Sequence, residues 1–61
     1  MATVIHGKGR SPPAAHGNVA RQIKEAADKL KVRVEDVEII EKGDPYKDSN
    51  GVWHVWTHVL F

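Results

Sequence analysis

The residues best suited to chemistry are gathered at the C-terminal end of the chain. Residues 52–61 include both tryptophans and two of the four histidines. This segment is rich in β-branched and aromatic residues and contains no Gly or Pro, so we expect a β-strand. Because side chains alternate between the two faces of a strand, Trp53 falls on one face while His54, Trp56 and His58 share the other.

His54 and His58 on one strand face suggest a metal site. Four residues along a strand span ~13 Å at ~3.3 Å per residue, whereas Zn–N bonds are about 2.0–2.1 Å long. A chelate would therefore need His6 from a neighbouring strand or a histidine from a symmetry copy. We expect no metal site, and instead histidines that line an interface or face water. If they are buried between subunits, their charging near about pH 6 would make assembly pH-dependent.

The two tryptophans are expected to have different roles. One packs in the core beneath a helix, and the other is an interface anchor or a platform on which an aromatic ligand stacks. The sequence leaves open which of Trp53 and Trp56 is which.

A glycine-rich segment at residues 7–11 offers free backbone N–H groups and the cations Lys8 and Arg10, which suits a phosphate. It is neither a Walker sequence nor a Gly-x-Gly-x-x-Gly fingerprint. An ordinary strand-to-helix turn with solvated basic side chains is the favoured interpretation, with Arg10 kept as a candidate ligand contact.

The acidic residues do not form a convincing site. Asp44, Asp48 and Asn50 resemble part of a calcium loop, but the distant bidentate Glu is missing and turn formation explains them. No arrangement of nucleophile, base and orienting residue is apparent. We therefore expect no catalytic residue and no enzymatic activity.

Length and composition set the remaining expectations. A chain of 61 residues without cysteine is one small domain, 1–61, with a marginal core that neither disulfides nor thiolate metal sites can reinforce. Self-association is then the remaining common means of stabilisation. The net charge of +1 gives no footprint for nucleic acid. Since neither a membrane span nor a signal peptide is recognisable, we expect a cytoplasmic protein with no membrane partner.

The pattern of elements predicts an α+β fold of order β-α-β-β. We expect a short strand at residues 3–6 that stops at Gly7, and an amphipathic helix that starts between residues 12 and 19 and ends near Lys31. A strand at residues 37–41, a hairpin loop at 43–51 with an Asn-Gly turn signal, and the final strand follow. The result is a three-stranded, mainly antiparallel sheet with one helix on one face. The first two strands are either parallel neighbours or separated by the third.

One helix can cover only one face of such a sheet. The other face carries one of the tryptophans, and an apolar patch of this kind usually marks an interface or a ligand groove. We therefore expect the last strand to pack against a second copy of the chain, and a ligand to bind at the same surface.

The order and spacing of these segments resemble the dodecin family. The similarity covers most of the chain: residues 9–12 (Gly-Arg-Ser-Pro), the amphipathic helix, residues 34–41 (Val-Glu-Asp-Val-Glu-Ile-Ile-Glu), residues 48–51 (Asp-Ser-Asn-Gly), and an alternating last strand that ends in Val-x-Phe. The resemblance implies an antiparallel sheet curled around the helix, a hollow dodecameric homo-oligomer, and binding of a flavin (FMN, FAD or riboflavin) or a similar aromatic cofactor.

A flavin would contact a different set of residues here from those in flavin-binding dodecins. Those proteins stack the ring on a Trp in the second strand, whereas residues 36–40 contain no aromatic side chain. In this chain the flavin ring would stack on an aromatic side chain of the C-terminal strand. The candidate cofactor contacts are Trp56, Trp53, His54, His58 and Arg10.

A second, weaker resemblance is to small tautomerases of the 4-oxalocrotonate type, at residues 9–11 and 37–41. Those enzymes use an N-terminal proline as the base, whereas residue 2 is Ala2 and the first proline is Pro12. Our leading hypothesis is thus a non-enzymatic, oligomer-forming binding or storage protein that sequesters an aromatic cofactor. The alternatives are an assembly or protein-interaction module with no small ligand and, third, a degenerate tautomerase-like enzyme.

Overall fold

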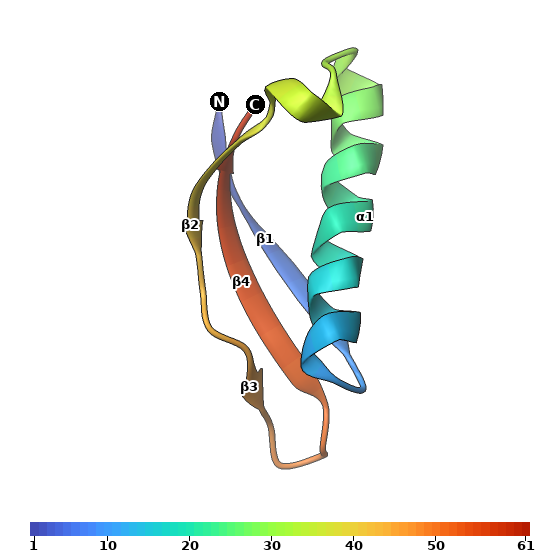
Figure 1. The fold of residues 1–61 in the computed structure, drawn as a ribbon, viewed down its shortest axis with the longest axis vertical. Helices are drawn as coiled ribbons and strands as arrows, with labels where there is room; N and C mark the ends of the chain where they lie inside the picture. Colours follow the sequence, from blue (N-terminus) through green and yellow to red (C-terminus); the bar gives the residue numbers. More distant parts are fainter.

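The computed structural model describes all 61 residues and shows one helix packed on one face of an antiparallel sheet (Figure 1). This arrangement confirms the predicted α+β class and the β-α-β-β order. The elements are β1 (Ala2–Gly9), α1 (Pro12–Leu30), a 3₁₀ turn (Val34–Asp36), β2 (Glu38–Lys42), the two-residue β3 (Tyr46–Lys47) and β4 (Trp53–Leu60).

Strand β4 is the centre of the sheet. It pairs with β1 along one edge, and with β2 and β3 along the other, always antiparallel. The first and second predicted strands therefore flank the third, which settles the alternative that the sequence left open. A bulge between Ile39 and Glu41 shifts the register of β2.

The helix begins and ends where its sequence provides caps. Ser11 is the N-cap, its hydroxyl accepting the Ala14 N–H at 3.3 Å, and Pro12 opens the first turn. Lys31 adopts a left-handed conformation with φ of 57°, and the Val32 N–H reaches back to the Ala27 carbonyl at 2.9 Å, as in a Schellman motif. The predicted helix is confirmed. No helix combines the length and the apolar character that crossing a membrane requires.

The core lies between α1 and the odd-numbered side chains of β4. Val55 and Val59 are fully buried against a stripe of helix residues, Ala15, Val19 and Ile23. Ala27, one helical turn further along the same stripe, is buried as well. Trp53 packs partly buried at the edge of this cluster. Trp56 therefore lies on the opposite, uncovered face of the sheet, which we call the outer face.

Two expectations about the strands were wrong. Strand β1 does not stop at Gly7 but continues to Gly9. Both glycines are needed for close packing: a Cβ on Gly7 would lie 2.5 Å from the Ala15 carbonyl oxygen, and one on Gly9 would lie 2.7 Å from the Ala14 Cβ. In addition, the predicted loop at 43–51 contains β3, which makes a fourth strand.

We expect Gly7→Ala to destabilise the protein by about 1–3 kcal/mol, because the added methyl group overpacks the contact with α1. Gly17 is the matched control, since it lies in the same helix–sheet unit but has nothing within 4 Å of its would-be Cβ. Gly17→Ala should stabilise by about 0.5–1 kcal/mol through helix propensity. Urea unfolding measures both. Equal changes in the two variants would contradict this account of Gly7.

Candidate functional site

Four ring side chains from three strands meet on the outer face. His54 and Trp56 come from β4, His6 lies opposite Trp56 on β1, and Tyr46 lies opposite His54 on β3. We call this group the ring cluster (His6, Tyr46, His54, Trp56).

The two histidines lie edge to edge. His6 Nε2 is 2.8 Å from His54 Nδ1, the ring planes differ by 8°, and the ring centroids are 5.0 Å apart. A nitrogen–nitrogen distance of 2.8 Å is too short for two faces stacked at van der Waals contact, and an in-line N–H···N bond places ring centres about 5 Å apart. The two imidazoles therefore share nearly one plane and are joined by a hydrogen bond.

The tyrosine and the tryptophan stack on this histidine pair. Trp56 lies over His6, with centroids 4.1 Å apart and planes 10° apart. Tyr46 lies over His54 with an offset, at 5.3 Å and 19°. The Trp56 indole N–H also donates to the Tyr46 hydroxyl at 3.2 Å, so both rings lie on the same side of the pair. Two stacks and two hydrogen bonds thus close a circuit of four side chains.

Asp48 fixes the direction of the hydrogen bonds. Its Oδ2 is 2.7 Å from His54 Nε2, and because a carboxylate only accepts, His54 donates from Nε2. Neutral His54 is then an acceptor at Nδ1, so His6 donates from its own Nε2. The result is a polarised chain that runs from His6 through His54 to Asp48.

The same carboxylate closes the hairpin before β4. Asp48 Oδ1 accepts the backbone N–H groups of Asn50 at 2.8 Å and Val52 at 3.0 Å. The hydrogen bond from His54, followed by those from Val52 and Asn50, lowers the pKa of the Asp48 carboxyl below its ordinary value. The turn-forming role predicted for Asp48 is therefore combined with a contact to the ring cluster.

The helix positions His6 through the backbone of β1. The Gln22 side-chain amide donates to the His6 carbonyl at 2.7 Å and to Asn18 Oδ1 at 2.8 Å. These bonds tie α1 to β1 at the point where His6 projects to the outer face. The part of β1 that carries His6 is thus fixed by hydrogen bonds from α1 on the other face of the sheet.

The ring cluster offers an aromatic surface rather than a metal cage. Trp56 and Tyr46 are each 48% exposed. No group of three or more His, Cys, Asp or Glu side chains is arranged to hold a metal ion, and the facing nitrogens of His6 and His54 point at one another. What the cluster can do chemically is to stack a flat aromatic ring on its exposed side chains.

Of the candidate cofactor contacts, the structure brings Trp56 and His54 together with His6. Trp53 lies on the helix side. His58 is on the outer face opposite Val4 and Glu41, but its side chain makes no hydrogen bond and no ring contact. Arg10 is exposed in the link between β1 and α1, without an ion pair.

Sequence reasoning missed Tyr46 and Asp48 as members of the site, because both lie in a segment dense in turn formers. A usable signal was the aromatic residue within that segment, since a tyrosine contributes nothing to turn formation. No protein-family model, no curated protein and no solved structure matches this chain.

We expect His54→Leu to raise the pKa of Asp48 towards its ordinary value, because the variant loses the largest cause of the lowering. His58→Leu is the control and should leave the pKa of Asp48 unchanged. Carboxyl-carbon NMR titration measures the pKa in each variant. An Asp48 pKa that is the same in wild type and His54→Leu would contradict the hydrogen bond.

The lowered pKa of Asp48 also determines how this residue affects stability as the pH changes. The folded-state pKa of Asp48 is depressed, so ionised Asp48 stabilises the fold above its unfolded pKa of about 3.9, and the contribution is lost as the pH falls through the lower folded value. The stability advantage of wild type over Asp48→Asn should therefore be constant near neutral pH and disappear in acid. Urea unfolding at several pH values measures it, and an advantage that grows in acid would contradict the assignment.

Proposed function

We propose that this chain is a non-enzymatic binding protein that self-associates through the outer face and holds a flat aromatic cofactor, of the flavin class, against Trp56. The observation that carries the proposal is that the Trp56 indole ring is both fixed in orientation and exposed. Trp56 is stacked on His6 at 4.1 Å, is oriented by its hydrogen bond to Tyr46, and is still half exposed on a face that nothing in the chain covers.

Self-association is supported by the small core and by what remains outside it. Only eight of the 61 residues are buried, and a domain of this size is marginal without a further source of stability. The outer face presents Val4, Tyr46, Trp56 and Leu60, all exposed. A second copy that presents the same face would bury these side chains in an isologous contact. The dodecin resemblance adds a closed shell of twelve copies as the expected form.

Ligand binding is supported by the ordering of the ring cluster. An aromatic platform loses little conformational freedom when its rings are already held parallel by neighbours, so less free energy is lost on binding. A flavin ring is flat and large enough to cover an indole. Lys8 lies opposite His54 on β1, and the exposed Arg10 follows at the end of that strand, so two cations are available for a phosphate.

The alternative is an assembly module whose outer face contacts protein only. It is supported by the closed circuit, since all the hydrogen bonds that orient the rings are satisfied within the chain. The two functions differ in one property. Only the first requires the exposed indole to take up a free aromatic molecule.

Titration with riboflavin distinguishes the cofactor-binding protein from the assembly module. We expect saturable quenching of riboflavin fluorescence by the wild type, because stacked flavin and indole are in contact. Trp56→Ala should weaken binding by about 5- to 150-fold, corresponding to the ~1–3 kcal/mol of one aromatic stack. Trp56→Phe should retain most of it.

Val34→Ala is the control, since Val34 is 44% exposed but lies in the 3₁₀ turn away from the ring cluster. It should bind riboflavin as the wild type does. If the wild type fails to quench riboflavin, or if Trp56→Ala quenches it equally well, the cofactor role is wrong and the assembly module is left.

A further inference from the structure

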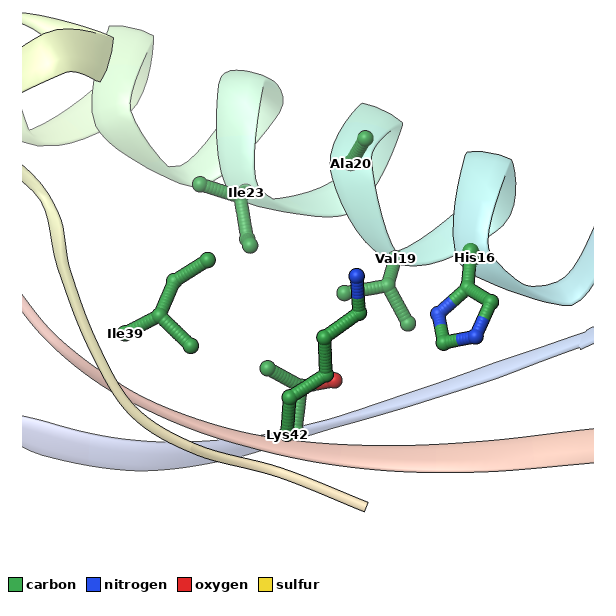
Figure 2. Close-up of a pocket in the computed structure, with 7 residues that line it drawn as sticks. His16, Val19, Ala20, Ile23, Ile39 and Lys42 are labelled. Carbon is green, nitrogen blue, oxygen red and sulfur yellow. The ribbon is translucent and has the colours of Figure 1, made fainter. Parts of the chain in front are cut away.

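A cavity of about 100 Å³ lies between α1 and the edge of the sheet, on the face opposite the ring cluster (Figure 2). It exists because α1 packs over β1 and β4, so the helix-facing side of β2 is left without cover. All five residues of β2 are exposed. The cavity is lined by His16, Val19, Ala20, Ile23, Ile39, Lys42 and Thr57.

Three polar side chains line this cavity, and none of them has a partner in the chain: His16, Lys42 and Thr57. Thr57 is 2% exposed, and its hydroxyl makes no hydrogen bond, which is unfavourable for a buried polar atom. Lys42 lies beside it, as its cross-strand neighbour, and forms no ion pair. In Figure 2 the Lys42 side chain rises across the opening towards α1, with His16 to one side.

Apart from His16, Lys42 and Thr57, the lining is apolar. Ile23 and Ile39 face each other at the end of the cavity away from His16 (Figure 2), and Val19 contributes to the wall. The cavity thus has an apolar end, and a polar part that holds one full positive charge, one unused hydroxyl and the His16 ring. This is the pattern expected for a small ligand with an aliphatic tail and a single negative charge.

We propose that this cavity binds a short aliphatic monocarboxylate. The alkyl chain lies between Ile23 and Ile39, and the carboxylate accepts from the Lys42 ammonium group and, once the long Lys42 side chain has moved aside, from the Thr57 hydroxyl. The volume of the cavity supports a short aliphatic monocarboxylate. An apolar cavity of about 150 Å³ accepts benzene, so about 100 Å³ suits a tail of roughly three or four carbons. A dianion such as phosphate would be matched by only one lysine and would meet apolar walls.

Sodium butyrate is the probe for the first test, with amide NMR spectra of the full-length wild-type protein as the readout. We expect saturable, millimolar binding that shifts the signals of Thr57, Ile23 and Ile39. Butylammonium has the same tail and the opposite charge, and should not bind. Lys42→Gln should weaken butyrate binding roughly tenfold, whereas Lys42→Arg retains the charge and should preserve it.

Thr57→Val gives a second test, because stability and butyrate affinity should change in opposite directions. The variant removes the unpaired hydroxyl at nearly constant shape, so it should raise the unfolding midpoint and at the same time weaken butyrate binding. Thr3→Val, on the neighbouring strand β1, is the matched control and should leave butyrate affinity unchanged.

Three results would overturn the proposal. Butyrate and butylammonium could shift the same signals equally, or Lys42→Gln could leave the affinity for butyrate unchanged. The signals of Thr57, Ile23 and Ile39 could instead shift with protein concentration alone, which would mean that a second copy fills the cavity. None of these results bears on riboflavin binding at Trp56, so the two sites are tested independently.

Discussion

The close approach of α1 to β1 is the constraint on which the other features depend. Gly7 and Gly9 provide no Cβ, so the helix backbone comes against β1 at Ala14 and Ala15. A single helix held there covers β1 and β4 but not β2. The helix leaves two surfaces of the sheet uncovered, the helix-facing side of β2 and the whole outer face (Figure 1). The cavity lies at the first surface, and the ring cluster lies on the second.

These two surfaces differ in how their polar groups are satisfied. In the ring cluster every oriented hydrogen bond is closed within the chain, from His6 through His54 to Asp48 and from Trp56 to Tyr46. That closure holds the four rings in fixed orientations on the outer face. In the cavity, by contrast, a hydroxyl and an ammonium group are left without partners. The first arrangement suits recognition by shape and stacking, and the second suits recognition of charge.

The sequence predicted the fold better than the site. Helix periodicity predicted α1 and its end near Lys31, with the start left open between residues 12 and 19. Gly7 was interpreted as a strand end because its role, to leave room for the helix, depends on a contact that local sequence does not show. The site was harder to predict because it also depends on pairing between strands, which local sequence does not show. A two-residue loop of Asn50 and Gly51 would pair Tyr46 with Val55 on the helix side. The observed loop has three residues, Ser49 to Gly51, with Gly51 at φ of 80°, and it pairs Tyr46 with His54.

The central claim is that the outer face is a contact surface for a second copy of this chain. The molar mass of the wild-type protein in solution, measured by light scattering across a range of concentrations, tests it most directly. We predict a folded assembly whose mass is a whole-number multiple of the 6.8 kDa chain, with twelve copies as the form that the dodecin resemblance implies. A folded protein of 6.8 kDa at every concentration would contradict the claim.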